Sequence, residues 1–528
     1  MDKKFGKELS SNSLASEFQD NKEWTELLDQ LNPQKKNAIL EILNPSIPEA
    51  LLSLHKRLYD LHKPFELLLS GSQAEVAQFP SAGIPAQSKS IAQHVRKDLN
   101  AGIGIAHDTN GQILAAPFID RFIDELRPDN CNTAVWQQVR NELLKYTSSL
   151  GAPWYRRVAR LRYLNDGKNA SNLMTSMERS LVVDPIPCYG GTSALSLVFW
   201  LFGGSGCPII FPRTYWGNMN LKCRIHGMQS ILCDYLDIDG RINPKRLRET
   251  LIKTRNEGFS KAIVYFNFPH NPTGAMPTPE EALALGDVCR EIASENFAIL
   301  TLSDEPYFPF VRGEHSSKIP FSYYLQPMDN TNMVTAVSIN GTKRDGIYGF
   351  RHSDLIFQYP YNISKEAVNI LEKDILQGLL RGIFSFSNVL NQYIVGRGLT
   401  QNPLLPLMSL SDIELSLMVS EEEQLMVEAM AEEVLKTSTI LSGKGFEDLN
   451  RVGSDEVAGG FFISYKPETS SAKEIHESGL KNQCGVIAAG QYVRINALLP
   501  TESRNEFSQN LMKTLDMCES NLKISSDD

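Results

Sequence analysis

With 528 residues, the chain is long enough for about two or three domains with substantial cores. Its net charge of −10, with no cluster of basic residues to reverse it, argues against a nucleic-acid-binding surface. Apolar residues make up 42% of the sequence, and no apolar run reaches the ~18–20 residues of a membrane-spanning helix.

The first 95 residues are expected to form a helical N-terminal extension followed by a linker. Between residues 24 and 69, leucines and isoleucines recur at helical spacing, and residues 46–49 have the sequence of a capping box. Residues 71–87 contain two prolines and two glycines among small polar residues, a composition typical of a linker. Residues 1–20 lack the pattern of a signal peptide, so a cytoplasmic location is expected.

Short apolar runs then alternate with longer helical patterns through the middle of the chain. This alternation favours an α/β fold in which helices cover both faces of a mostly parallel sheet. The expected strands lie at 208–211, 262–266, 298–302 and 334–337.

The C-terminal part has a different pattern. Residues 421–441 are typical of a long amphipathic helix, whereas 459–465 and 485–499 are typical of strands. They predict a second, smaller α/β unit.

Polar residues with chemical potential follow several of the expected strands. Trp216 comes after the strand at 208–211, Asn271 after 262–266, Asp304 after 298–302 and Lys343 after 334–337. Ligands of open parallel sheets bind at the carboxyl ends of the strands, so these side chains are expected to share one site.

The order and spacing of these residues resemble those of the fold-type I aminotransferases, and most closely the aspartate aminotransferase family. The resemblance rests on Asn271-Pro-Thr-Gly, on Asp304 with Tyr307 three residues later, and on Lys343 with Arg351 eight residues later. It extends from about residue 97 to about residue 500. It implies a fold-type I transferase with a large domain around a mostly parallel seven-stranded sheet, a smaller α/β domain, and pyridoxal 5′-phosphate as cofactor. The corresponding division is 1–95 for the extension, 151–399 for the large domain, and 96–150 with 400–528 for the small domain.

The resemblance also assigns roles around the cofactor. Lys343 would bind it covalently as a Schiff base and then move a proton as the catalytic base. Asp304 would keep the pyridine nitrogen protonated, while Tyr307 and Asn271 would hydrogen-bond the ring oxygen. The other residues matched to the cofactor are Trp216 on the ring, Gly190, Gly191, Thr192, Asn340 and Arg351 at the phosphate, and Tyr146 reaching the phosphate of the neighbouring subunit.

Two arginines point to the substrate class. Arg494 matches the residue that binds the substrate α-carboxylate, and Arg381 matches one that crosses a dimer interface to bind the distal carboxylate of aspartate or glutamate. Gly104, Trp216 and Asn271 complete the expected substrate site. The implied function is therefore that of a homodimeric aminotransferase acting on an acidic amino acid and a 2-oxo acid.

Some features depart from the family and keep alternatives open. Asn340 stands where a serine is usual, Met219 where a histidine is usual, and the N-terminal extension is similar to that of aspartate β-decarboxylases. An aspartate β-decarboxylase, an aromatic aminotransferase and a non-catalytic binding or regulatory protein on the same scaffold remain possible. The eight cysteines are scattered without a Cys-x-x-Cys pair, so no metal site is expected.

Overall fold

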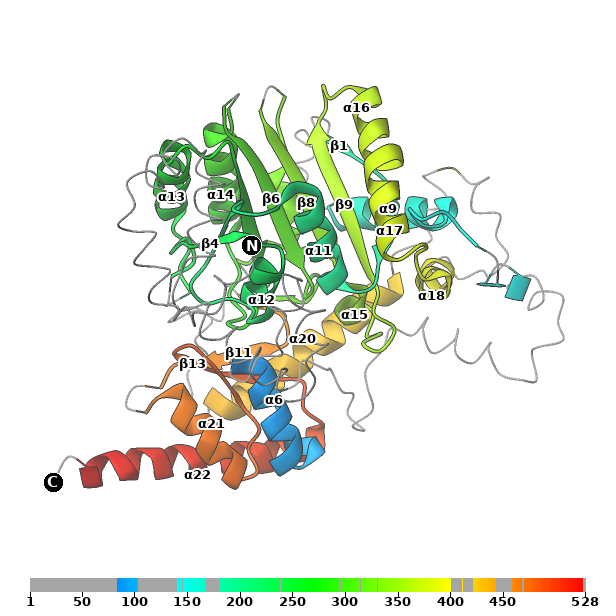
Figure 1. The fold of residues 1–528 in the computed structure, drawn as a ribbon. Coiled ribbons are helices and arrows are strands. Elements are labelled where there is room, and N and C mark those ends of the chain that lie inside the picture. The colour runs from blue at the N-terminus through cyan, green and yellow to red at the C-terminus, as the bar shows by residue number, and fades with distance from the viewer. Residues whose placement is uncertain are drawn as a thin grey trace, which may run out of the picture.

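The computed structural model describes residues 83–102, 140–167, 180–399, 411, 421–442 and 458–525, apart from 142, 145, 238, 239, 295, 314, 330, 468 and 469. The helices expected between residues 24 and 69 lie outside these residues. Within them, the chain forms a large α/β part around one sheet and a smaller part on the side where the parallel strands of that sheet end (Figure 1). None of the helices described is long and apolar enough to cross a membrane.

The central sheet is mostly parallel, as the sequence predicts. Strands β4, β3, β5, β6 and β8 are parallel, and β9 runs antiparallel to β8. The far edge is shared by β1 and β2, which both pair with β9, so eight strands occupy the seven expected positions. The strand order is β1 (Ser180–Val182), β9 (Ser353–Pro360), β8 (Met333–Ile339), β6 (Ala298–Glu305), β5 (Lys261–Asn267), β3 (Pro208–Phe211) and β4 (Gln229–Leu232), with β2 (Ile186–Cys188) beside β9.

Helices cover both faces of this sheet because its strands are apolar on both sides. Along β5, Ile263 and Tyr265 join one buried cluster, whereas Val264 and Phe266 join the other. The first cluster contains α11 (Gly191–Phe202), α12 (Asn218–Ile225), α16 (Lys365–Asn369), η5 (Ile370–Leu376) and α17 (Gln377–Ile383). The second contains α13 (Pro244–Asn256), α14 (Pro279–Ile292) and η4 (Phe321–Leu325).

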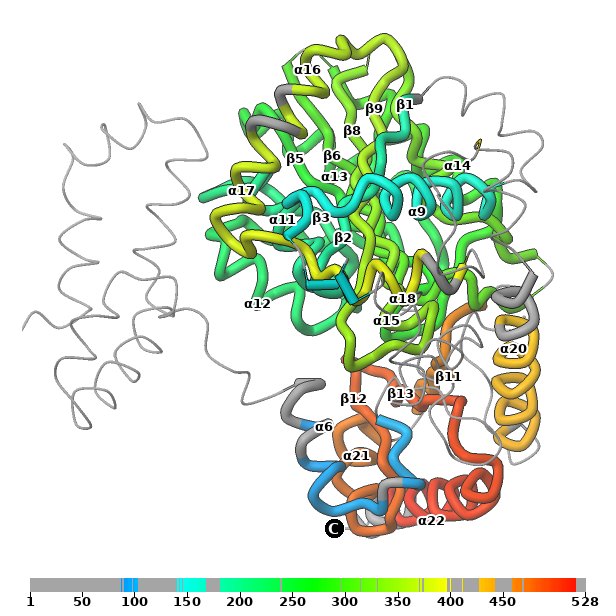
Figure 2. The backbone as a smooth tube through the Cα atoms, turned by 90° about the vertical axis from the view of Figure 1, so that its right-hand side faces the viewer, coloured from blue at the N-terminus to red at the C-terminus, as the bar shows by residue number. Residues whose placement is uncertain are grey.

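The smaller part is a three-stranded antiparallel sheet packed with helices (Figures 1 and 2). Its strand order is β11 (Phe462–Tyr465), β13 (Tyr492–Asn496) and β12 (Ile487–Ala489). Its helices are α20 (Glu421–Ser442), as expected from the amphipathic pattern, α21 (Ala472–Lys481) and α22 (Thr501–Ser525). Helix α6 (Gly83–His94) packs against β12 and α21. The first strand expected in this part is divided, since β10 (Ala458–Gly459) pairs with β7 (Val311–Arg312) instead.

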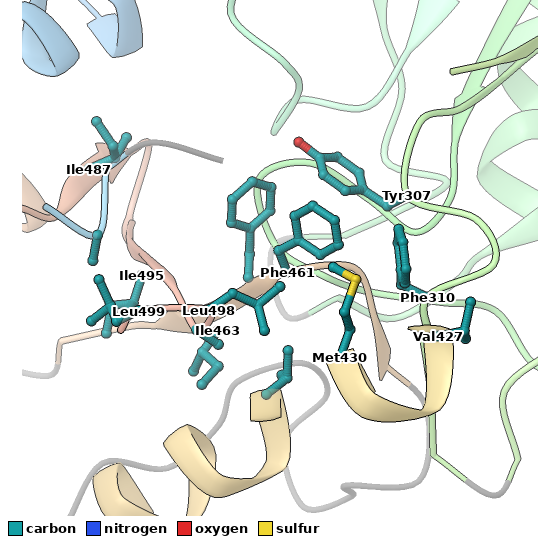
Figure 3. Close-up of a cluster of buried hydrophobic side chains, with 14 of the residues drawn as sticks. Tyr307, Phe310, Val427, Met430, Phe461, Ile463, Ile487, Ile495, Leu498 and Leu499 are labelled. Carbon is teal, nitrogen blue, oxygen red and sulfur yellow. The ribbon is translucent and has the colours of Figure 1, made fainter. Parts of the chain in front are cut away.

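An apolar cluster joins the two parts (Figure 3). The rings of Tyr307 and Phe310, which follow β6, lie 5.3 and 4.8 Å from the ring of Phe461. Met430 from α20 and Leu498 belong to the same buried cluster. The start of β11 is thereby held against the loop that leaves the carboxyl end of β6.

Candidate active site

A cavity of about 350 Å³ lies at the carboxyl ends of the parallel strands. Both parts of the chain line it, since Arg494 belongs to β13 and Asp304 to β6. The structure therefore brings together most of the residues predicted from the sequence. Those that line the cavity are Gly191, Thr192, Trp216, Asn271, Asp304, Tyr307, Asn340, Lys343, Arg351 and Arg494.

Lys343 lies in the one-turn helix α15 (Gly341–Arg344), directly after β8. The side chain of Asn340 caps this helix by accepting a hydrogen bond from the Thr342 amide at 3.1 Å. The Lys343 Nζ lies 4.8 Å from the centroid of the Tyr348 ring. Burial, together with the charges of Arg494 and Arg351, lowers the pKa of the Lys343 amine to about 7. A substantial fraction of this amine is thus unprotonated, and nucleophilic, near neutral pH.

Asp304 lies near the carboxyl end of β6 with its side chain buried. Its Oδ2 accepts a hydrogen bond from Tyr265 Oη at 2.9 Å. Burial raises the pKa of the Asp304 carboxyl to about 6, and the Tyr265 hydrogen bond and the nearby charge of Lys222 oppose that rise. The group can therefore still present a carboxylate to the cavity at neutral pH.

Asn271 and Arg494 hold each other in place. Arg494 Nη1 donates to Asn271 Oδ1 at 2.9 Å, and Nη2 donates to the carbonyl oxygen of Gly102 at the same distance. The guanidinium carbon lies 4.3 Å from the centroid of the Phe462 ring. The buried Nε has no hydrogen-bond partner among the residues described. Because that donor faces no protein acceptor, Arg494 retains capacity for an anionic ligand.

The start of α11 provides a second place for an anion. Gly190 precedes this helix with φ of 76°, and a Cβ added to it would lie 2.9 Å from Arg351 Nη2. A Cβ on Gly191 would lie 2.8 Å from Asn340 Nδ2. Two side-chain donors therefore lie directly at the N-terminal end of a helix, where backbone N–H groups and the helix dipole attract negative charge.

Three predicted residues that the structure describes do not line this cavity, and the first of them, Gly190, directly precedes Gly191, which does. Gly104 lies outside the residues described. Tyr146 is 86% exposed, and its ring stacks on that of Phe386 at 4.8 Å. The Arg381 guanidinium lies 5.7 Å from the centroid of the same ring, on the exposed surface. Within one chain, Tyr146 and Arg381 are thus neighbours of each other but not of Lys343.

The structure adds residues that the sequence analysis did not select. Asn267 accepts a hydrogen bond from the Asn271 amide and donates one to the Asp304 carbonyl, both at 2.8 Å. The feature of the sequence that could have identified Asn267 is its position four residues before Asn271. Phe462 had no such signal, since an aromatic residue in an apolar strand usually belongs to the core. Met219 is fully buried in the apolar cluster on the α11 face.

Comparisons with known proteins agree with this architecture. Residues 169–355 match the family model described as "Aminotransferase class I and II". The aspartate aminotransferase of Bacillus subtilis (strain 168) is 33% identical over 156 residues, which cover 29% of this chain and 36% of that protein. The chain thus matches about a third of the length of this curated relative.

Solved structures show the same fold. An aminotransferase from Anaerococcus prevotii superposes with a TM-score of 0.64 at 17% identity, over 84% of this chain and 98% of that one. An aromatic-amino-acid aminotransferase from Burkholderia pseudomallei, covalently bound to pyridoxal phosphate, gives a TM-score of 0.59 at 18% identity, over 83% and 98% of the two chains. The chain has the fold-type I aminotransferase fold, and its residues 169–355 carry the class I and II sequence pattern.

Proposed function

We propose that this protein is a pyridoxal-phosphate-dependent aminotransferase that transfers an amino group between an acidic amino acid and a 2-oxo acid. The observation that carries the proposal is the convergence of Lys343, Asp304 and Arg494 on one cavity at the carboxyl edge of the sheet. A buried amine, a buried carboxylate and a buried guanidinium are each costly to retain, so their meeting favours a catalytic site over a decayed one.

The residues present fit pyridoxal phosphate. The close approach of Arg351 and Asn340 to Gly190 and Gly191 leaves no room for larger residues there and suits a phosphate. The cavity volume lies within the range of small-molecule sites. Trp216 supplies an aromatic surface for a planar ring. When bound, the cofactor would supply an aldehyde that condenses with amines and a ring that accepts electron density from the substrate Cα.

The protein side chains then have separable tasks. The Lys343 amine, with its pKa lowered to about 7, can take up the proton of the substrate Cα and return it elsewhere. Asp304 would accept a hydrogen bond from the protonated ring nitrogen. Arg494 would bind the α-carboxylate through its Nε, which has no partner among the residues described. Because Arg494 Nη1 donates to Asn271 Oδ1, the amide nitrogen of Asn271 would be the donor toward the ring oxygen.

The acidic substrate and the homodimer are linked parts of this proposal. Arg381 and Tyr146 lie outside the cavity of their own chain, so they can serve a site only in a neighbouring subunit. Both contact Phe386, and the ring of Phe384 lies 5.1 Å from that of Tyr189 nearby. Exposed aromatic residues beside an arginine are typical of interface cores. We also propose a cytoplasmic location.

A product screen tests the proposed reaction. The purified protein with pyridoxal phosphate is incubated with each amino acid and 2-oxoglutarate, while 2-oxo-acid products and carbon dioxide are followed together. We expect a 2-oxo acid and glutamate from aspartate, no stoichiometric formation of alanine with carbon dioxide, and no product with Lys343→Ala. Carbon dioxide with alanine would indicate β-decarboxylation, and a preference for aromatic donors would indicate an aromatic aminotransferase. Silence with every donor would contradict the proposal.

A further inference from the structure

The carboxylate of Asp304 is contacted from the neighbouring strand by Tyr265. Tyr265 Oη donates to Asp304 Oδ2 at 2.9 Å, and both side chains are buried. Tyr265 pairs in register with Leu302, and Asn267 pairs with Asp304. Since paired residues of parallel strands point to the same face, Tyr265 lies one step below Asp304 on the cavity side of the sheet. It reaches the carboxylate from beneath, while Asp304 itself lines the cavity.

The backbone at Tyr265 is fixed by another buried tyrosine. Tyr235 Oη donates to the carbonyl oxygen of Tyr265 at 2.6 Å. The hydroxyls of these two tyrosines thus have different targets, since one bonds a carboxylate and the other only the backbone. Burial raises the pKa of the Tyr265 phenol well above its ordinary value, so this hydroxyl stays a donor throughout the neutral range.

We propose that Tyr265 is a positioning residue that orients the Asp304 carboxylate toward the cofactor's ring nitrogen and favours its ionised form. The inference rests on the proposed function and extends it to a residue that touches neither the cofactor nor the substrate.

The physical reason is the cost of a carboxylate in a buried place. The Asp304 side chain is buried, and an ionised carboxylate in a buried place needs hydrogen-bond donors to compensate for the water it loses. The Tyr265 hydroxyl supplies one such donor to Oδ2, and the Ser338 side chain also hydrogen-bonds this carboxyl. Buried Lys222 is a cation near Asp304. Its Nζ donates to the Thr192 carbonyl at 2.7 Å and to Ser196 Oγ at 2.5 Å, and its charge also favours the Asp304 carboxylate.

The test compares two cofactors on the full-length protein. One is pyridoxal phosphate, and the other is its analogue with C–H in place of the ring nitrogen, which keeps the aldehyde and the phosphate. Dissociation constants are measured by equilibrium dialysis for the wild type and for Tyr265→Phe. Losing a hydrogen bond to a charged group should weaken binding of pyridoxal phosphate about tenfold and binding of the analogue less than about twofold. The kcat for the acidic donor should fall while its KM stays nearly constant.

Tyr235→Phe is the matched control, because it removes a buried hydroxyl that bonds the Tyr265 backbone from the other face of the sheet without touching Asp304. This variant should change the dissociation constants of both cofactors by the same factor. Tyr265→Met removes the same hydroxyl with different packing and should reproduce the selective loss if Tyr265→Phe folds poorly. If the two Tyr265 variants bind both cofactors equally weakly, or bind both as tightly as the wild type does, the proposed role of Tyr265 would be overturned but the proposed function would not. Failure of the wild type to bind pyridoxal phosphate would instead overturn the proposed function.

Discussion

At the scale of single residues, the amine of Lys343 has an altered affinity for protons. Burial and two neighbouring guanidinium groups lower its pKa to about 7, whereas a solvent-exposed lysine titrates near ~10.4. Below pH 7 the amine is mostly protonated, and the protonated form cannot attack an aldehyde. We therefore expect the rate of covalent capture of pyridoxal phosphate by the cofactor-free protein to rise as pH increases through about 7 and to level off above that pH.

Stopped-flow absorbance measures this profile, and borohydride reduction followed by peptide mapping locates the bond. The pyridoxyl group should be found on Lys343, and Lys343→Ala should abolish the capture. Lys222 is the internal control for the mapped label, because it is also a buried lysine near the site. Burial lowers the pKa of its amine only to about 8. A rate that keeps rising to pH 10, or a label on a different lysine, would contradict the assignment.

The two arginines named for substrate binding make separate predictions. Arg494 lies in the cavity, and every amino acid carries an α-carboxylate, so Arg494→Ala should lower kcat/KM for all donors. Arg381→Ala should lower kcat/KM only for acidic donors. The loss should correspond to ~2–5 kcal/mol of transition-state stabilisation, the cost of truncating one partner of a charge pair. Steady-state kinetics with aspartate and with a neutral donor give both ratios. Equal losses for the two donors in Arg381→Ala would make this arginine structural.

At the scale of elements, α15 is held by two buried ion pairs to α9 (Pro153–Asp166). Arg344 donates to both carboxylate oxygens of Asp166, at 2.7 and 2.8 Å, and Arg162 Nη2 lies 2.5 Å from Asp345 Oδ1. Arg162 and Asp166 are one turn apart on α9, so they present a positive and a negative group from the same helix face. The two residues that directly follow Lys343 are thereby fixed in place.

Breaking one of these pairs should be costly. The side chain of Arg344 is only 1% exposed, so Arg344→Met leaves a largely buried Asp166 carboxylate without its bidentate partner. We expect urea unfolding of the cofactor-free protein to show a loss of about 3–5 kcal/mol, part of which Asp166→Asn recovers in the double variant.

The matched control is Arg246→Met, which breaks an exposed pair with Glu249. It should change the free energy of unfolding by less than about 1 kcal/mol. If Arg344→Met were as mild as this control, the ion pairs would not be what fixes the turn that carries Lys343.

The elements also show what the sequence could predict. The strands at 208–211, 262–266, 298–302 and 334–337 were found because each is apolar on both faces. The first of them matches β3 at both ends. The carboxyl ends of the other three were placed too early, since β5, β6 and β8 continue to Asn267, Glu305 and Ile339. A polar residue at the end of an apolar run favours the prediction of a turn, although here such residues lie within the strands and contribute to the site. Tyr265 was missed because its partner Asp304 lies on another strand, and local patterns do not encode such pairs.

At the scale of the whole molecule, we propose the division into domains derived from the sequence, with one large domain at 151–399. Two separate apolar clusters fill the two faces of the large sheet. A third cluster fills the small part and continues into the large domain through Tyr307, Phe310 and helix α9. Helix α6, from the end of the N-terminal extension, packs on β12 and α21 (Figure 2). Since Arg494 lies in β13, any motion of this small part would move Arg494 relative to Lys343.

The last prediction concerns assembly. Tyr146 and Arg381 lie together around Phe386 on the surface, whereas Lys343 and Asp304 share the cavity of one chain. In a homodimer with shared sites, a Lys343→Ala subunit paired with an Arg381→Ala subunit forms one site with both residues and one with neither. Random mixing makes about half of the dimers hybrid, so activity toward the acidic donor should return to about a quarter of the wild-type value.

Mixing Lys343→Ala with Asp304→Ala provides the matched control. These residues belong to one cavity, so a hybrid dimer contains two damaged sites and should stay inactive. Sedimentation measures the assembly state of each mixture. Recovery in the first mixture alone requires that Arg381 acts in the site of the other subunit, because no rearrangement within one chain restores a missing Lys343. Full activity in a monomer, or equal recovery in both mixtures, would contradict shared sites and remove the structural reason for expecting an acidic substrate.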